Sequence, residues 1–180
     1  MRICVYCGAK NGSHQVYQET AKELGKMLAQ SNIELVYGGG HVGLMGTIAD
    51  SVIQNGGKVI GVIPQKLVDK EQAHHSIQDL RIVEDMHQRK AMMANLSDAF
   101  IALPGGFGTL EELFEVLTWS QIGYHQKPIA LINVNCFYDS LVKFIDHAIQ
   151  EGFIFREHRE LLKVVSTPQM ALDSLLQDLK

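Results

Sequence analysis

The sequence predicts a single-domain, doubly wound (Rossmann-like) α/β fold with a mostly parallel sheet and helices on both faces. Short, continuously apolar segments alternate with segments of helical periodicity along the whole chain, as in parallel sheets that are covered on both sides. The length of 180 residues is typical of one domain, so residues 1–180 are expected to form one nucleotide-binding unit. Hydrophobic residues make up 46% of the chain, enough to bury a core without metal ions or disulfides.

Strands are expected in the apolar runs that end at a turn, and Pro64 ends the third of them. The expected strands are Ile3–Tyr6, Ile33–Tyr37, Lys58–Ile63, Arg81–Val83, Ala99–Leu103, Pro128–Ile132 and Lys163–Val165. Helical periodicity predicts the helices Val16–Ala29, Leu44–Gln54, Met86–Leu96, Leu110–Ile122 and Tyr138–Gln150, and Thr167-Pro168 is typical of the start of a last helix. The polar stretch Gln65–Gln78 has no clear period and is expected to be a long loop.

Charge and cysteine content exclude several classes of protein. Sixteen basic and twenty acidic residues, without a basic block, argue against a nucleic acid or an anionic membrane as partner. No apolar run approaches the ~18 residues of a membrane span. Three cysteines without a signal peptide favour a reducing, cytoplasmic location. Cys4 and Cys7 are expected to point to opposite faces of the first strand, as core thiols rather than as a redox or metal pair.

A first glycine-rich turn follows the second expected strand. Gly38, Gly40 and Gly43 form G-x-G-x-x-G before a helix, a context that suits a phosphate because backbone N–H groups and a helix N-terminus attract anions. A nicotinamide dinucleotide site would also need an acidic residue about 20 positions on, and residues 63–66 supply none. No Gly-Lys-Ser/Thr follows, which excludes a Walker A loop.

A second glycine-rich turn, Pro104–Glu112, follows the strand that ends at Leu103. Two such turns on one sheet predict a small phosphorylated ligand between them. Thr109 and Glu112 also fit a capping box, with Thr109 at the N-cap and Glu112 returning to it, and this interpretation is favoured for Glu112 taken alone. Glu111 and Glu115 are not explained as caps. Carboxylates beside a phosphate site repel the bound phosphate, so their presence there indicates that at least one has a functional role.

Two adjacent cations, Arg89 and Lys90, lie near the start of an expected helix. Cations there oppose the helix dipole, so they are interpreted equally well as anion ligands or as part of a solvated face. The eight histidines show no metal-ligand spacing and are interpreted as scattered surface or packing residues. His87 is the exception to follow, because it lies beside Arg89.

Together these segments resemble the LOG ("Lonely Guy") family of cytokinin riboside 5′-monophosphate phosphoribohydrolases over essentially the whole chain. The family's P-G-G-x-G-T-x-x-E motif is intact at 104–112, its M-H-x-R-K motif at 86–90, and C-G-x-x-x-G at 7–12. Where relatives commonly carry serines after Cys-Gly, this chain has Ala9-Lys10-Asn11, which leaves open whether backbone N–H groups or Lys10 hold a phosphate. Some relatives are labelled lysine decarboxylases, an interpretation rejected here because no lysine has a recognisable Schiff-base setting.

The resemblance implies that Arg89 and Glu112 form the catalytic pair. The substrate-binding residues that it implies, together with the glycines of the turns, are Gly8, Gly39, Gly40, Gly43, Glu71, Lys90, Gly106, Phe107, Gly108, Thr109, Leu110, Glu111 and Thr118. It also implies a homodimer. The stripe of Phe114, Leu117 and Trp119 could serve an interface, although core packing is favoured for a stripe at helical spacing.

The implied reaction is hydrolysis of the N-glycosidic bond of a nucleoside 5′-monophosphate to free base and ribose 5-phosphate. Such a reaction passes through an oxocarbenium-like sugar, which a carboxylate stabilises, so Glu112 or Glu111 suits it. It requires no metal and no cofactor. The base is left open among adenine, another purine and an N6-modified cytokinin. The alternatives are a non-catalytic nucleotide-binding module and, less favoured, an NAD-linked oxidoreductase.

Overall fold

The computed structural model describes residues 1–68, 70 and 72–179, and its strands all belong to one sheet. The sheet has seven parallel strands in the order β4-β3-β2-β1-β5-β6-β7. Their bounds are β1 Arg2–Tyr6, β2 Glu34–Tyr37, β3 Val59–Pro64, β4 Asp79–Val83, β5 Ala99–Ala102, β6 Ile129–Ile132 and β7 Leu162–Val165. The doubly wound α/β prediction is confirmed, with ends that differ by one or two residues, and the sheet is entirely parallel.

The helices alternate with the strands, as the periodicity predicts. Their bounds are α1 Gln15–Gln30, α2 Gly43–Gln54, α3 Gln65–Val68, α4 Met86–Leu96, α5 Phe107–Gln121, α6 Asp139–Gln150 and α7 Pro168–Asp178, with short 3-10 segments at Val134–Cys136 and Arg156–Leu161. Thr167 caps α7, since its side chain accepts a hydrogen bond from the Met170 N–H. The expectation of an unstructured stretch over Gln65–Gln78 is wrong at its start, where α3 continues directly from β3.

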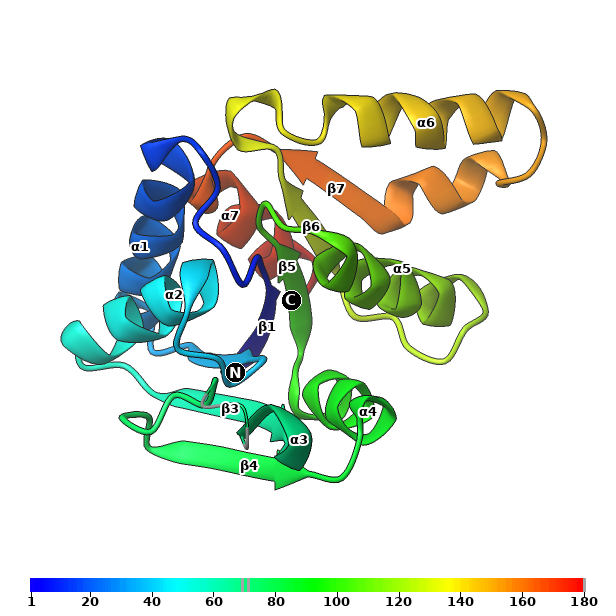
Figure 1. The fold of residues 1–180 in the computed structure, drawn as a ribbon. Coiled ribbons are helices and arrows are strands. Elements are labelled where there is room, and N and C mark those ends of the chain that lie inside the picture. Colours follow the sequence, from blue (N-terminus) through cyan, green and yellow to red (C-terminus); the bar gives the residue numbers. More distant parts are fainter. Residues whose placement is uncertain (69, 71, 180) are drawn as a thin grey trace.

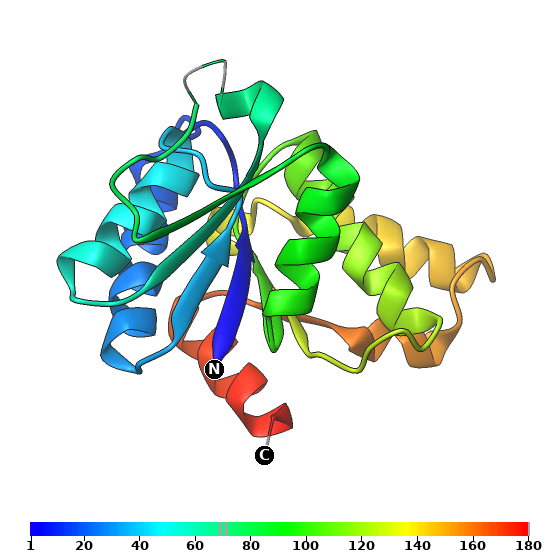
Figure 2. The same cartoon turned by 90° about the horizontal axis from the view of Figure 1, so that it is seen from below.

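Helices cover both faces of the sheet (Figures 1 and 2), and a hydrophobic core lies on each face. Ile3 and Val5 of β1 pack with α1, α2 and α7, whereas Cys4 and Tyr6 pack with α4, α5 and α6. This alternation follows from the two-residue period of a strand. Cys7 joins the first core and Cys4 the second, both as free buried thiols, so the expected separation of the two cysteines is confirmed.

The order of the strands places a crevice at the carboxyl end of β1. From β1 the chain builds the sheet toward β2, β3 and β4 on one side, and it later returns to β5 on the other side of β1. The turns after neighbouring parallel strands therefore face one another across this switch point, where open α/β sheets bind ligands. Among the described helices, none is both long and apolar enough to cross a membrane.

Candidate active site

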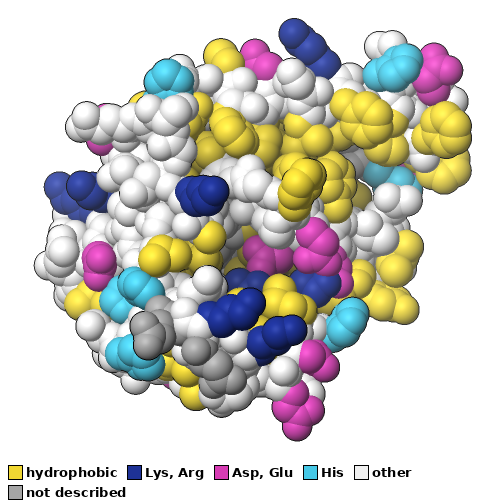
Figure 3. All heavy atoms as spheres, in the orientation of Figure 1, with side chains coloured by type: hydrophobic (Ala, Val, Ile, Leu, Met, Phe, Trp, Pro, Cys, Tyr) yellow, Lys and Arg dark blue, Asp and Glu magenta, His cyan; other side chains and the backbone are white. Residues whose placement is uncertain are grey.

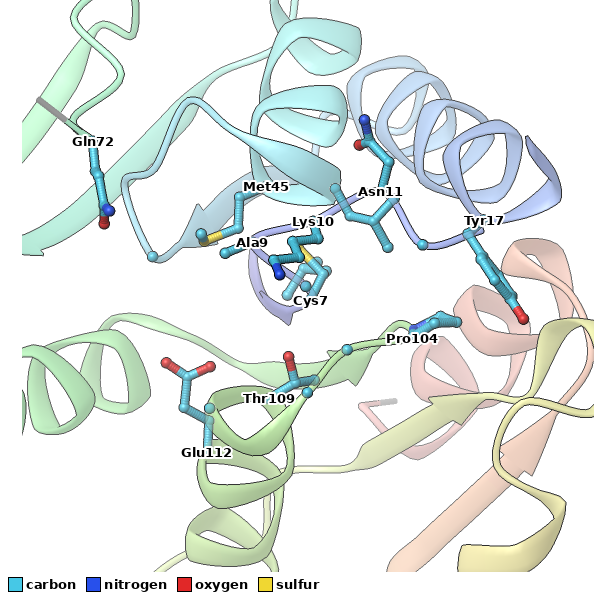
Figure 4. Close-up of a pocket in the computed structure, with 18 of the residues that line it drawn as sticks. Cys7, Ala9, Lys10, Asn11, Tyr17, Met45, Gln72, Pro104, Thr109 and Glu112 are labelled. Carbon is cyan, nitrogen blue, oxygen red and sulfur yellow. The ribbon is translucent and has the colours of Figure 1, made fainter. Parts of the chain in front are cut away.

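A cavity of about 560 Å³ opens at the carboxyl ends of β1, β2 and β5 (Figure 4). Three turns line it: residues 7–12 after β1, the glycine turn after β2 and residues 104–109 after β5. Arg89 of α4 and Glu112 of α5 line the same space. The cavity thus lies between the two glycine-rich turns, where the sequence predicts a small ligand.

Arg89 and Glu112 form a buried ion pair beside this cavity. Nη1 of Arg89 donates to Oε1 of Glu112 over 2.8 Å, and each residue is only 7% exposed. Nε of Arg89 donates to the backbone oxygen of Val62 over 3.1 Å, which fixes the guanidinium plane. Burial raises the pKa of the Glu112 carboxyl, and the Arg89 charge counteracts this rise only in part. The result is a carboxylate that is held in place with little surrounding water.

The start of α5 differs from the predicted capping box. The helix begins at Phe107, with Gly106 at its N-cap, so Thr109 already lies inside the first turn and cannot cap it. Glu112 consequently lies in the second turn, where its side chain reaches Arg89 rather than the N-cap backbone. The capping interpretation is wrong because Gly106 reaches an extended N-cap conformation (φ −100°, ψ −152°) three residues earlier than Thr109 would.

A second charged cluster lies next to the pair. Nζ of Lys90 is hydrogen-bonded to Oε1 of Glu111 and donates to Oε1 of Glu115 over 3.0 Å. Figure 3 shows acidic and basic side chains side by side near the middle of this face. Burial lowers the pKa of the Lys90 amine, but its hydrogen bonds to Glu111 and Glu115 outweigh burial and raise the pKa. Arg89 and Lys90 are therefore not a solvated face: both are buried, and their partners in this structure are carboxylates.

The glycines of the two turns serve different purposes. A Cβ on Gly38 would lie 2.0 Å from Nη2 of Arg89, so this position makes room for the guanidinium. A Cβ on Gly106 or Gly108 would meet no atom within 4 Å, so the backbone at the start of α5 is open to the cavity that both residues line. Exposed N–H groups at a helix N-terminus form a natural anion site.

Only part of the predicted set of site residues lines the cavity. Those that do are Gly8, Arg89, Gly106, Gly108, Thr109 and Glu112. The predicted site residues that do not line the cavity are Gly39, Gly40, Gly43, Lys90, Phe107, Leu110, Glu111 and Thr118. All of them except Thr118 are close in sequence to a residue that does line it. The exposed Thr118 lies on α5, and its hydroxyl donates to the backbone oxygen of Phe114. Glu71 lies outside the described residues.

Several lining residues were not anticipated from the sequence. Leu67 and Gln72 come from the segment after β3, Met45 from α2, Tyr17 from α1 and Phe137 from the turn before α6. No motif marks these side chains, because all except Gln72 are apolar or aromatic, and a cavity wall of that kind needs only shape. The signal that could have found them is topological: each comes from an element whose end adjoins the carboxyl edge of the sheet.

The stripe on α5 divides between core and surface. Leu117 and Trp119 are partly buried and pack against the second core, as core packing predicts. Phe114 is instead 37% exposed on the same helix. His87 is exposed on α4, and within the described part of the chain no three histidine, cysteine or acidic side chains converge as metal ligands would.

Gly43 offers a test of how tightly the turns pack. It has φ +63°, and a Cβ there would lie 2.3 Å from the carbonyl carbon of Ala9. Gly43→Ala is expected to lower the free energy of unfolding by about 3 kcal/mol or more, since left-handed strain adds to a backbone clash. Gly123→Ala is the matched control: Gly123 has φ +82° but open space around it, so only about 1–2 kcal/mol is expected. Equal losses for both in urea denaturation would contradict the proposed packing.

Comparison with known proteins identifies the family of this chain. A family model described as "Possible lysine decarboxylase" matches residues 45–175. The probable cytokinin riboside 5′-monophosphate phosphoribohydrolase LOGL2 of Oryza sativa subsp. japonica is 51% identical over 174 residues, which are 97% of this chain and 71% of that protein. The cytokinin riboside 5′-monophosphate phosphoribohydrolase LOG3 of Arabidopsis thaliana is 53% identical over 167 residues, 93% and 77% of the two chains.

The solved structures that resemble this chain share its fold at much lower identity. The molybdenum cofactor binding protein of Rippkaea orientalis superposes with a TM-score of 0.76 at 22% identity, covering 99% of this chain and 97% of that one. At that identity the likeness concerns the fold alone. The identity to the plant enzymes is high and extends over nearly the whole chain. The protein therefore belongs to the LOG family of cytokinin riboside 5′-monophosphate phosphoribohydrolases.

Proposed function

We propose that this protein hydrolyses the N-glycosidic bond of purine nucleoside 5′-monophosphates. Water adds to C1′ of the ribose as the bond to the base nitrogen breaks, which yields free base and ribose 5-phosphate. The buried Arg89–Glu112 pair beside the cavity, joined over 2.8 Å, is the observation that carries the proposal. It is supported by the relatives of the same family, which are named as phosphoribohydrolases of cytokinin riboside 5′-monophosphates.

The Glu112 carboxylate supplies the negative charge that this chemistry needs. Positive charge develops on the sugar ring as the base departs, and a fixed carboxylate beside C1′ stabilises it. The same carboxylate can orient the attacking water and accept its proton. Its raised pKa makes it a stronger base than an exposed glutamate, because the surroundings favour its protonated form.

Arg89 acts electrostatically in this proposal. A guanidinium stays protonated, so it stabilises negative charge on the departing base or on the ribose phosphate without donating a proton. Among the described residues, Nη2 of Arg89 has no hydrogen-bond acceptor, whereas Nε and Nη1 are occupied by Val62 and Glu112. That leaves the two N–H groups of Nη2 on a fixed guanidinium for substrate at the cavity wall.

The open backbone at Gly106 and Gly108 suits the 5′-phosphate. Its N–H groups and the N-terminus of α5 attract an anion, and binding energy gained there positions the sugar at Glu112. Lys90 and Glu111 are hydrogen-bonded to each other next to the site, outside the lining of the cavity. The charged state of Lys90 argues against lysine-based covalent chemistry, because a Schiff-base amine must be neutral to attack a carbonyl.

A product assay tests the proposed reaction. Purified protein incubated with AMP or with N6-isopentenyl AMP is expected to release adenine or the N6-substituted base in equal amounts with ribose 5-phosphate, separated by chromatography. The ratio of the two rates identifies the preferred base. Bound nucleotide with no released base would instead establish the non-catalytic nucleotide-binding module.

We further propose that the whole chain acts as one domain, in the cytoplasm, as a homodimer. A reducing compartment suits the three cysteines, all of which are free, and one sheet takes strands from the first residues to Val165. Large apolar side chains lie exposed on α5, on α6 and after them, namely Phe114, Ile122, Tyr124, Phe144, Phe153 and Phe155. Figure 3 shows hydrophobic side chains gathered on the surface of this part of the molecule. A second copy would bury them. Sedimentation is expected to give twice the monomer mass; a monomer would refute the dimer.

A further inference from the structure

Lys10 lies on the turn that follows β1. It lines the cavity and is exposed. Its side chain extends from this turn into the space that faces Thr109 (Figure 4). In residues 1–68, 70 and 72–179, no carboxylate lies within ion-pair distance of Lys10. Lys10 is thus a cation at the ligand cavity whose charge is not matched by any carboxylate of the described residues.

The backbone that carries Lys10 is held by both neighbouring turns. The N–H of Gly8 donates to the backbone oxygen of Pro104 over 3.0 Å, and the Leu44 N–H donates to the backbone oxygen of Gly8 over 3.0 Å. The turn packs closely against Gly43: a Cβ on Gly43 would lie 2.4 Å from the backbone nitrogen of Lys10. The turn is therefore positioned by the same two segments that form the predicted phosphate cradle, and residue 10 projects from a fixed backbone.

The charges next to the cavity indicate a role for the Lys10 ammonium group. Among the described residues, Glu111, Glu112 and Glu115 form ion pairs with Arg89 and Lys90, so three carboxylates stand against two cations next to the cavity. A phosphate dianion that binds at the start of α5 therefore enters a region with an excess of negative charge. The helix N-terminus contributes only about half an elementary charge. A further cation on the opposite wall offsets this repulsion.

We propose that Lys10 is a ligand of the substrate's 5′-phosphate and sets the preference of the site for nucleotides over nucleosides. The inference rests on the proposed function only in that it takes a nucleotide as the ligand, and not on cleavage. The ammonium group would contact the phosphate from the side opposite Gly106 and Thr109. An uncharged residue at position 10 would leave the ribose and base contacts unchanged and weaken only the hold on phosphate.

Binding measurements test this role without requiring turnover. In a Glu112→Gln background, calorimetric titration with AMP and with adenosine is expected to show that Lys10→Met weakens AMP binding about 10-fold and leaves adenosine binding within about 2-fold. Lys10→Arg, which keeps the charge, is expected to retain most of the AMP affinity. Lys58→Met is the matched control. The Lys58 side chain is 77% exposed and precedes β3, at the amino end of the strands, whereas the cavity lies at their carboxyl ends.

Ribose 5-phosphate provides the same comparison with Glu112 in place, since it has no base to release. Its affinity is expected to fall with Lys10→Met and to depend less on salt concentration in that variant. Equal losses for AMP and adenosine, or no loss for either phosphorylated ligand, would overturn the inference. If AMP binds through Lys10 but no base is ever released, the hydrolase proposal fails and this one stands. If base is released and Lys10→Met binds AMP normally, the reverse holds.

Discussion

Glu112→Gln is expected to lower the turnover of AMP by about 100- to 10,000-fold, the range that a positioned acid–base group contributes. The amide has the shape of the carboxylate and can still accept the hydrogen bond from Nη1 of Arg89, but it carries no charge to stabilise an oxocarbenium-like sugar and cannot accept a proton. Turnover is measured by base release at saturating AMP. A folded circular dichroism spectrum and retained AMP binding separate lost chemistry from lost structure.

Glu111→Gln is the matched control for this variant. Glu111 is adjacent in sequence, its side chain is 51% exposed, and it contacts Lys90 rather than the cavity. Its loss is expected to lower turnover by less than about 10-fold, as for a group that supports the site indirectly. Comparable losses in the two variants would transfer the catalytic role to Glu111 or deny it to both.

The pH dependence provides a further readout for Glu112. Burial raises its pKa above the ordinary 4.5, so activity that needs the carboxylate is lost as pH falls through this raised value. Between the two pKa values the folded protein binds more protons than the unfolded chain, so the free energy of unfolding decreases as pH rises through that window. Glu112→Gln is expected to remove both effects.

Arg89→Met is expected to cost about 3–5 kcal/mol of unfolding free energy and to abolish base release, because it leaves the Glu112 charge buried without its partner. The double variant Arg89→Met/Glu112→Leu is expected to recover most of the lost stability but none of the activity, since removing both charges removes the desolvation penalty. Urea denaturation measures the first quantity and the product assay the second.

Lys90→Met provides the comparison for Arg89. The carboxylates that it would leave behind, Glu111 and Glu115, are 51% and 23% exposed and can turn to water, so a smaller loss of stability is expected. If Arg89→Met were no more destabilising than Lys90→Met, or if the double variant were as unstable as the single one, the ion pair would not be the buried, strongly coupled unit described above.

The alternation of apolar and helical segments was sufficient to predict the sheet and nearly every helix. It worked because the strands are buried on both faces and therefore read as continuous apolar runs. It missed α3, whose four residues, Gln65–Val68, include none that is buried and are too few for a helical period to be recognised. It also could not predict the order of the strands, which depends on which faces pack rather than on any local preference.

The start of α5 shows a different kind of failure. Thr109 and Glu112 have the spacing of a capping box, and that local pattern is energetically sound. The helix begins three residues earlier, with Gly106 as its N-cap, and the buried Arg89 of α4 forms an ion pair with Glu112. A sequence pattern describes only neighbours along the chain, so it could not weigh an ion pair between residues 23 positions apart.

The chain's residues thus already indicated an α/β fold, two glycine-rich turns at strand ends and a set of charged residues near them, because these features depend on local periodicity and backbone freedom. Folding decided which charges meet: Arg89 with Glu112, Lys90 with Glu111 and Glu115, and Lys10 with no carboxylate among the described residues. It also decided that Gly38 admits a guanidinium while Gly106 and Gly108 leave their backbone open. The reason is that charge pairing and close approach act across space, between elements that are distant in sequence.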